Sequence, residues 1–353
     1  MKLRKIFAAV LAAAALTMTM TACQSDNTSG SSDSNASGDP AANSSDVNSD
    51  NGGNDNASDK KYSIGICQLI EHPALDAATD GFMAALTDKL GDNVEFNKQN
   101  AQGESTNCTT ICNTFVASNV DLILANATGA LQAAASATNT IPIVGTSITN
   151  YAVAMDIDDW ANKTMDNITG TSDLAPIDGQ EDMLVELFPD VQQVGILYCS
   201  AEANSKYQVN LFEQALEADG IAYKEYSVAD TNEIQAVTTT AVGECDVLYI
   251  PTDNTLANAA ETVRNVVVPA NIPVIAGEEG ICSGCGVATL SISYYDIGYK
   301  AGEMAYDILT NGTKAGDLDI AFAPQFVKEY NADICTELGI TPPEDYVAIA
   351  AEG

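Results

Sequence analysis

The sequence predicts an α/β protein made of two lobes, each a doubly wound parallel sheet. From Tyr62 onward, short β-branched runs alternate with longer amphipathic stretches, and turn residues stand at each junction. The alternation occurs twice in succession, which predicts two sheets that are each covered by helices on both faces. The folded part, of roughly 290 residues, also exceeds what one hydrophobic core usually serves. Two lobes are therefore the default expectation.

The expected elements follow from these runs in chain order. In the first half, the runs that predict strands are 62–68, 94–97, 122–125 and 142–145, and the amphipathic stretches that predict helices are 73–90, 105–118 and 129–138. In the second half, strands are expected at 194–199, 223–228, 247–250 and 274–276, and helices at 177–187, 203–219, 233–242 and 255–268. A last helix is expected over 294–310, because apolar residues recur there at helical spacing.

Polar segments follow the ends of the predicted strands. Ligands of open α/β sheets bind beyond the carboxyl ends of the strands, where helix N-termini converge, so two facing lobes predict a cleft lined by these segments. They are 68–73, 126–128, 146–147, 200–205, 252–255 and 277–280. The alternative is that these residues only cap helices, which Thr128, Ser200 and Asp253 would do well. Capping explains Glu202, Glu278 and Glu279 less well, since Glu is a poor N-cap.

The N-terminus has the layout of an export signal. Lys2, Arg4 and Lys5 precede an apolar run, and the small residues of Met20-Thr21-Ala22-Cys23 follow. The tetrapeptide resembles a bacterial lipobox, which predicts cleavage before Cys23 and lipidation of its thiol. The alternatives are an ordinary secretory signal and a membrane anchor, although the apolar run is shorter than the ~20 residues that span a bilayer.

A linker and an acidic domain follow the signal. Residues 24–59 are mostly Ser, Asn, Asp and Gly, which predicts a disordered leash with a reach of roughly 35 Å. The formal charge of -35 becomes about -38 without the signal, and such a surface repels phosphate backbones, so nucleic acid is excluded as a partner. Arg264 is the only arginine of the mature chain, so backbone N–H groups and hydroxyls must hold any acidic ligand.

The eight cysteines after Cys23 do not have the spacing of a disulfide framework. Cys67 and Cys199 fall in predicted core strands, where a free thiol behaves as a small apolar side chain. Cys108 and Cys112 would share one helix face. Cys282 and Cys285 flank a Gly-containing loop and could close a small ring. No zinc site is expected, because no His stands near either pair.

Catalysis is not expected, and neither is a cofactor. His72 is the only histidine, and its position beside Pro73 suits a cleft edge, a cap or an ordinary surface site. Gly280-Ile281-Cys282-Ser283-Gly284 has the spacing of a nucleophile elbow, but no His follows it in the chain. Neither a P-loop nor a dinucleotide fingerprint occurs. The residues therefore favour a binding protein over an enzyme.

Five short motifs resemble a known family in order and spacing. They are Gln68-Leu69-Ile70-Glu71-His72-Pro73-Ala74-Leu75-Asp76, Asn100-Ala101-Gln102-Gly103, Glu202-Ala203-Asn204-Ser205, Pro251-Thr252-Asp253-Asn254-Thr255 and Glu278-Glu279-Gly280. Together they resemble the ABC-transporter substrate-binding lipoproteins of the tryptophan and tyrosine uptake type, over about residues 62–331. The stretch Ser283 to Gly286 departs from the family's pattern.

This resemblance implies a type I periplasmic-binding-protein fold, with two lobes joined by three crossovers. The implied organisation is a lipoprotein signal peptide at 1–22, a linker at 23–60, a first lobe of 61–165 plus 287–318, and a second lobe of 166–286 plus 319–353. The implied function is the lipid-anchored, extracytoplasmic binding component of an ABC importer, which closes around a small molecule and delivers it to a permease and its ATPase. A monomer is expected.

An aromatic amino acid is the ligand that the resemblance favours, and the cleft offers matching chemistry. The ligand carboxylate would meet hydroxyls and helix starts at Thr128, Thr146, Ser147 and Ser205. Its ammonium would meet Asp253, then Glu202, then Glu278 in order of preference. The matched motifs add Gln68, Glu71, Asn204 and Asn254. Aromatic candidates for the side-chain pocket are Tyr151, Trp160, Tyr198, Tyr207 and Tyr294.

Other functions remain open at this point. A purine or a different amino acid could be the ligand, and sugars are less favoured because Arg264 lies within a predicted helix. An adhesin or a ligand sensor could also be built on this fold, since fold alone does not fix function.

Overall fold

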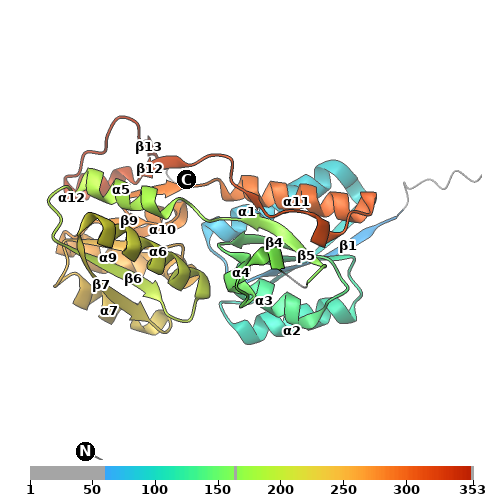
Figure 1. The fold of residues 1–353 in the computed structure, drawn as a ribbon. Helices are drawn as coiled ribbons and strands as arrows, with labels where there is room; N and C mark the ends of the chain where they lie inside the picture. Colours follow the sequence, from blue (N-terminus) through green and yellow to red (C-terminus); the bar gives the residue numbers. More distant parts are fainter. Residues whose placement is uncertain (1–59, 163–164, 351–353) are drawn as a thin grey trace, which may run out of the picture. The chain divides into compact units, whose positions relative to one another are not determined.

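The computed structural model describes residues 60–162 and 165–350, which lie within one compact unit of the chain. The predicted export signal, the predicted lipidation site Cys23 and the predicted linker lie outside the described residues. Two sheets organise the described part, and each is covered by helices (Figure 1). Within that part, no helix has the length and hydrophobicity of a membrane span.

The first lobe is built on six strands in the order β11-β5-β4-β3-β1-β2, all parallel. Their bounds are β1 Tyr62–Gln68, β2 Val94–Asn100, β3 Leu122–Asn126, β4 Ile143–Ile148, β5 Ile168–Ser172 and β11 Ala321–Phe322. The side chains of the central strands alternate between two cores. Ile64 and Ile66 pack under α1 (Pro73–Leu90) and α11 (Tyr294–Asn311), whereas Cys67 packs against α2 (Ser105–Ala117) and α3 (Thr128–Ala137). Both faces of the sheet are thus buried.

The second lobe is built on seven strands in the order β13-β12-β10-β9-β8-β6-β7. Their bounds are β6 Gln193–Cys199, β7 Ala222–Val228, β8 Val247–Ile250, β9 Val274–Ala276, β10 Ala288–Ser291, β12 Val327–Tyr330 and β13 Val347–Ala348. Only β10 and β12 pair antiparallel among the described strands. One face packs against α5 (Ile177–Leu187), α6 (Ala203–Asp219) and α12 (Ala332–Leu338), and the other against α7 (Ile234–Ala241), α9 (Ala260–Ala270) and α10 (Glu279–Cys285).

The chain passes between the sheets three times, after β5, after β10 and after β11. The number of crossovers agrees with the prediction, but the lobe boundaries do not. Strand β5 pairs with β4, so the first lobe extends to Ser172 instead of residue 165. Strand β10 pairs with β9 and belongs to the second lobe, and the two residues of β11 return to the first. These short strands carry too few residues for their pattern to reveal the sheet that they join.

Most predicted elements have the expected bounds, and the strands β1, β8 and β9 and the helices α1, α5 and α6 match at both ends. The helix predicted over 255–268 is instead two, α8 (Asn254–Asn258) and α9, which are separated at Ala259. Residues 279–285, predicted as a loop, form the helix α10, which begins because Glu278 caps it. A short helix, α4 (Tyr151–Ala154), was not predicted.

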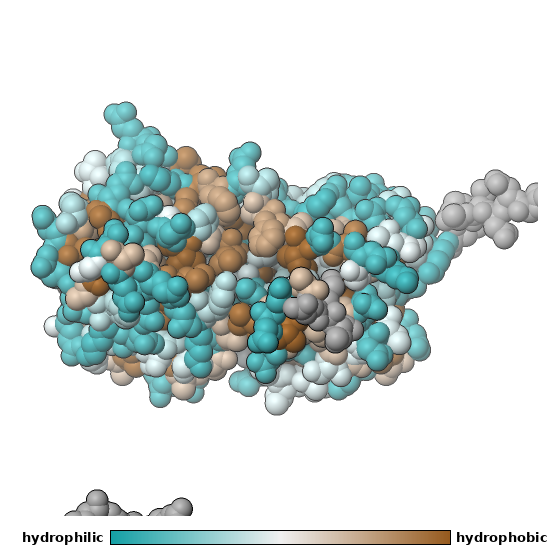
Figure 2. All heavy atoms as spheres, in the orientation of Figure 1, coloured by the Kyte–Doolittle hydropathy of each residue, from teal (hydrophilic) through white to brown (hydrophobic). Residues whose placement is uncertain are grey.

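Helices α1 and α11 cross at very close range. Carbonyl groups of α1 face Gly298 and Gly302 of α11, and a Cβ atom on Gly298 would overlap the Ala78 carbonyl oxygen. Figure 1 shows the two helices side by side. On the face drawn in Figure 2, hydrophilic residues cover much of the surface and hydrophobic residues gather toward the middle. The α1–α11 contact holds the segment that follows the second crossover onto the first lobe.

Candidate ligand-binding site

The carboxyl ends of strands from both sheets border a cavity of about 460 Å³. Thr128 and Gly129, at the start of α3, line it from the first lobe. Glu202 and Asn204 line it from the second lobe, at the start of α6. Three of the predicted site residues, Thr128, Glu202 and Asn204, therefore share one cavity, as the strand-end argument requires.

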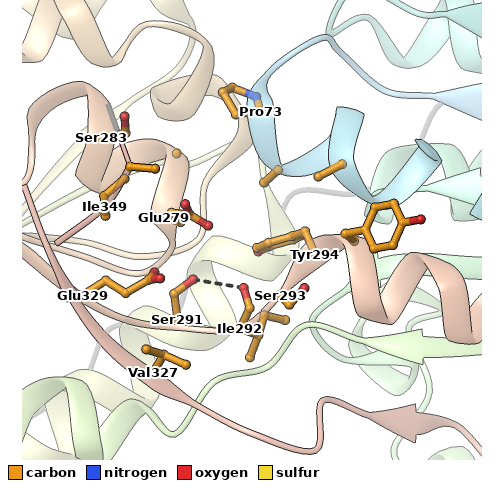
Figure 3. A pocket seen from close by; sticks show the side chains of 15 residues that line it. Pro73, Glu279, Ser283, Ser291, Ile292, Ser293, Tyr294, Val327, Glu329 and Ile349 are labelled. Carbon is orange, nitrogen blue, oxygen red and sulfur yellow. Dashed lines mark hydrogen bonds between the residues drawn. The ribbon is translucent and has the colours of Figure 1, made fainter. Parts of the chain in front are cut away.

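A second cavity, of about 420 Å³, lies beside the second crossover (Figure 3). Pro73 at the start of α1 and Glu279 and Ser283 of α10 line it, together with the crossover residues 291–295. Of the residues predicted for the site, only Tyr294, an aromatic candidate, is among the described residues that line it. We take the first cavity, together with the buried polar groups at the carboxyl edge of the first sheet, as the candidate site.

Four buried polar atoms at the carboxyl edge of the first sheet have no hydrogen-bond partner among the described residues. They are His72 Nδ1, Asn126 Oδ1, Ser147 Oγ and Asp173 Oδ1. Each residue follows or ends a different strand of the first lobe, namely β1, β3, β4 and β5. Because buried polar groups are nearly always paired, four such atoms at one sheet edge indicate a surface built to meet a polar ligand.

The backbone is strained at the same edge. Ala127, which precedes α3, has φ 83° and ψ 159°, a conformation usually restricted to glycine. Ser147 has φ 56° beside a register irregularity in β4. The N–H of Ala127 donates to the Thr146 carbonyl oxygen at 3.1 Å, so the two strained residues are neighbours. Strain of this kind gathers at functional sites, where the surrounding structure holds it in place.

Helix α3 begins without a side-chain cap, whereas α8 and α10 of the second lobe are each capped by a carboxylate. The first N–H groups of α3 have no intrahelical partner, and the helix dipole gives that end a partial positive charge. The edge of the first lobe therefore suits an anionic group, which Thr128 and Ser147 could also meet with their hydroxyls.

The three predicted ammonium partners all accept backbone hydrogen bonds within the second lobe. Asp253 accepts from Leu256 N–H at 2.9 Å and Cys199 N–H at 2.6 Å. Glu278 accepts from Gly280 and Ile281 N–H, both at 2.6 Å. Capping, which was expected to explain Glu278 less well than other residues, therefore does account for its position. Burial raises the pKa of Asp253 to about 8 and that of Glu278 to about 7.

Glu202 does not cap its own helix but serves the neighbouring loop. It accepts hydrogen bonds from the N–H and hydroxyl of Thr255, both at 2.8 Å, and from the N–H and side-chain amide of Asn254. The N–H groups that open α8 are thus satisfied by Glu202 as well as by Asp253. This explains why two acidic residues stand near one short helix.

Asp173 is a candidate site residue that the sequence prediction missed. It is 4% exposed and follows β5, and its Oδ2 accepts the Tyr294 hydroxyl at 3.2 Å while Oδ1 has no partner among the described residues. Burial raises its pKa to about 6. The β-branched run at Ile168–Ser172 was the signal that could have located it, because a strand there places Asp173 at a strand end.

The other predicted residues divide into structural and exposed positions. Gln68 is buried between Thr79 and Asp76, and its polar atoms are satisfied within the first lobe. Glu71 is exposed. Thr146 accepts the Thr171 hydroxyl, and Ser205 donates to the Thr252 carbonyl oxygen. Asn254 is hydrogen-bonded to His72. Since His72 is only 7% exposed, the alternative prediction that it is an ordinary surface residue was wrong.

The aromatic candidates separate clearly. Tyr294 is buried beside Asp173, and Tyr151 donates to the Thr171 carbonyl oxygen while its ring lies 5.2 Å from that of Trp160. Tyr198 packs in the core of the second lobe and donates to Glu225, and Tyr207 is half-buried on α6. The aromatic residues near the polar edge therefore come from the first lobe and the second crossover.

Comparisons with known proteins point to one family. Residues 63–353 match the model of the family described as ABC transporter substrate binding protein. A tyrosine-binding protein of Clostridioides difficile (strain R20291) is 37% identical over 266 residues, which cover 74% of this chain and 76% of the relative.

Solved structures give the same result. An ABC domain from Streptococcus pneumoniae in complex with L-Trp is 31% identical and has a TM-score of 0.76, covering 81% of this chain and 97% of that chain. A ligand-free, open structure of a substrate binding protein with adhesive properties from Clostridium difficile is 34% identical and has a TM-score of 0.64, covering 82% and 100%. The two lobes and three crossovers are the type I periplasmic-binding-protein fold that the sequence predicted. From its cleft, its fold and its relatives, the chain belongs to the family of ABC transporter substrate binding proteins.

Proposed function

We propose that this protein is the extracytoplasmic binding component of an ABC importer and that its ligand is an aromatic amino acid, tyrosine or tryptophan. The observation that carries the proposal is that the carboxyl edge of the first sheet has groups that favour an anion and a group that favours a cation. The uncapped start of α3 and Ser147 Oγ favour an anion, and the unpartnered Oδ1 of Asp173 favours a cation. A free amino acid presents both charges, on an ammonium and a carboxylate group that are bonded to the same carbon.

In this assignment the ligand carboxylate accepts hydrogen bonds from the first N–H groups of α3, from Ser147 and from Thr128. Arg264 is not needed, and it is engaged elsewhere, because its guanidinium pairs with Glu337 on the second lobe. Backbone N–H groups at a helix start bind carboxylates without any cationic side chain.

The ligand ammonium donates to Asp173, which replaces Asp253 as the first candidate. Asp253, Glu202 and Glu278 stay in the proposal as acidic groups that make the second lobe favourable to a cation. Their oxygens already accept backbone N–H groups, so a ligand would share them instead of satisfying them. A positive charge beside Asp173 would lower the pKa that burial has raised.

The aromatic side chain of the ligand has aromatic neighbours of the kind it needs. Tyr294 lies at the polar edge through its bond to Asp173, and Tyr151 packs with Trp160 in the same lobe. The two relatives named for their ligands add support, since one is a tyrosine-binding protein and the other is in complex with L-Trp. The higher TM-score to the L-Trp complex than to the open, ligand-free structure is consistent with lobes closed as they would be around a ligand.

The location and partners complete the proposal. The signal pattern before Cys23 supports export and a lipid anchor on that residue, and the linker would let a monomeric binding domain reach a permease with its ATPase. Closure of the lobes would create the surface that the permease recognises, because only the closed state is stabilised by ligand. The family binds substrates and is not a family of enzymes, so no catalytic residue is assigned.

A calorimetric titration of residues 60–353 tests the ligand. The protein is unfolded, stripped of bound molecules and refolded, then titrated with L-tyrosine, L-tryptophan and L-phenylalanine, with leucine, adenosine and ribose as comparators. We expect micromolar or tighter binding of an aromatic amino acid. Asp173→Asn and Ser147→Ala should weaken it roughly 10- to 100-fold, because each removes a hydrogen bond to a charged group.

Matched variants on the surface control for the substitutions. Asp182→Asn on α5 and Ser136→Ala on α3 change exposed side chains of the same types and should leave affinity unchanged. Tight binding of leucine, adenosine or ribose with none of the aromatic amino acids would overturn the proposed ligand.

Adhesion is the second candidate function, since one relative of known structure has adhesive properties. Attachment to host cells that survives loss of ligand binding in Asp173→Asn would separate the two functions.

A further inference from the structure

The only histidine of the chain lies at the meeting of the two lobes. His72 precedes α1 in the first lobe, and its Nε2 is 3.2 Å from Oδ1 of Asn254, which opens α8 in the second lobe. The pair is buried. None of the ion pairs found among the described residues joins the lobes.

The hydrogen-bond network fixes which nitrogen of His72 carries the hydrogen. Asn254 Nδ2 donates to Glu202 Oε2 at 2.7 Å, which leaves Asn254 Oδ1 facing His72 as an acceptor. Nε2 of His72 must therefore be the donor. Nδ1 is then bare in the neutral ring, and it is buried with no partner in the described part of the chain.

Glu202 anchors the far end of this chain of hydrogen bonds. Its other oxygen accepts the N–H and hydroxyl of Thr255, so the carboxylate cannot swing toward His72 without freeing buried donors. The chain runs from a fixed carboxylate of the second lobe, through an amide, to an imidazole of the first. Opening of the cleft breaks it only at the bond between His72 and Asn254.

We propose that Glu202, Asn254 and His72 form a latch that holds the closed state, so that His72 acts as a positioning residue that sets ligand affinity and its dependence on pH. The inference rests on the proposed capture of an amino acid for its probe, but it does not depend on which side chain the ligand carries. His72 acts through lobe closure and is not assigned a contact with the ligand.

The expected pH dependence has a definite sign. Burial lowers the pKa of His72, and the opposing effects of Asn254, Glu202 and Asp76 are smaller. Opening exposes the ring to water, where its pKa returns to about 6.5. The latch is therefore at full strength above about pH 6.5 and is lost as the pH falls through the lowered pKa, because the buried imidazolium is disfavoured.

Calorimetry on five variants tests the latch, with L-tyrosine and L-tryptophan as probes. His72→Ala and Asn254→Ala should each weaken binding about tenfold at pH 7.5, and the double variant should be no weaker than either, because both break one bond. His72→Gln keeps a donor for Asn254 and should bind within about threefold of the wild type. Asp80→Asn, exposed on the same helix, should bind unchanged.

The pH profile separates a latch from a packing role. From pH 7.5 to 5.5 the wild type should lose about five- to tenfold more affinity than His72→Gln, which cannot titrate. Asp173, Glu278 and Asp253 are present in both proteins, so the difference between them isolates His72. Equal profiles, or additive losses in the double variant, would overturn the proposal.

Nitrogen NMR of the single histidine gives a readout that does not use affinity. The protein is labelled at the imidazole nitrogens and purified without a polyhistidine tag. With ligand, we expect a protonated Nε2, a bare Nδ1 and a lower pKa than in the stripped protein. If neither amino acid binds the wild type, the proposed ligand fails, and the spectrum of the protein as purified decides the latch. An imidazole that titrates at the ordinary value there would overturn it.

Discussion

Single residues of this protein divide sharply between those that build the site and those that would meet a ligand. Asp253 and Asp173 show the division best, because both are buried carboxylates at strand ends. Both oxygens of Asp253 accept backbone N–H groups, whereas one oxygen of Asp173 has no partner among the described residues. Residue type and position in the sequence are alike for the two, so only hydrogen-bond accounting separates their roles.

This division predicts different consequences for the two substitutions. Asp253→Ala leaves two buried N–H groups unpaired and should lower the free energy of unfolding by about 2 to 4 kcal/mol. Asp173→Asn should lower affinity with a change in the free energy of unfolding within about 1 kcal/mol. Urea denaturation and calorimetry on the same samples check both. If Asp253→Ala instead kept the stability of the wild type but lost ligand affinity, Asp253 would be a residue that contacts the ligand.

The strain at Ala127 makes a second prediction at this scale. Ala127→Gly should stabilise the protein by about 1 kcal/mol, because glycine adopts φ 83° and ψ 159° without strain. Ala135→Gly, which lies inside α3, should destabilise the protein by about 1 kcal/mol because glycine has a lower helix propensity than alanine. Opposite shifts in denaturant midpoint are the expected result, and two shifts of the same sign would count against strain at Ala127.

Among the elements, α11 shows how a segment that returns from the second lobe is held on the first lobe. It follows the second crossover and packs on α1 through Gly298 and Gly302, where the helix backbones touch. Apolar residues of both helices then cover Ile64 and Ile66 of the sheet. The sequence predicted the helix from its apolar spacing, but the spacing says nothing of the glycine contact.

Gly298→Ala should therefore lower the free energy of unfolding by more than about 2 kcal/mol, because the added Cβ overlaps the Ala78 carbonyl and forces the helices apart. Gly243→Ala is the matched control, since no atom lies within 3.4 Å of its added Cβ. Thermal unfolding of both variants tests this. Equal melting temperatures for the two would contradict the close crossing.

At the scale of the whole molecule, the described cysteines are buried in the hydrophobic cores of both lobes. All eight described cysteines are free and buried, and Cys282 and Cys285 lie one turn apart on α10 instead of flanking a loop. Hydrophobic cores on both faces of each sheet stabilise the described part of the chain.

Residues 60–353 should therefore show eight thiols in a colorimetric thiol assay after denaturation and almost none while folded. A reducing agent should leave the melting temperature unchanged, because no bond is available to reduce. Six thiols in the denatured protein would reveal a disulfide and would correct this description.

The sequence by itself determined the fold class, because the periods of strand and helix persist over long segments such as Tyr62–Gln68 and Pro73–Leu90. It also determined the family, through motifs that stand in order. These features are local or ordered along the chain, so each can be recognised without knowing what touches it.

Only the tertiary structure decided the roles of the acidic residues, the sheet to which β5, β10 and β11 belong, and the position of His72. Each depends on partners far away in the chain, such as Asn254, which lies 182 residues from His72. A carboxylate whose oxygens accept backbone N–H groups and a carboxylate with an oxygen that has no partner look alike in a sequence. The physical difference is the set of donors within hydrogen-bond distance, and folding alone brings those donors together.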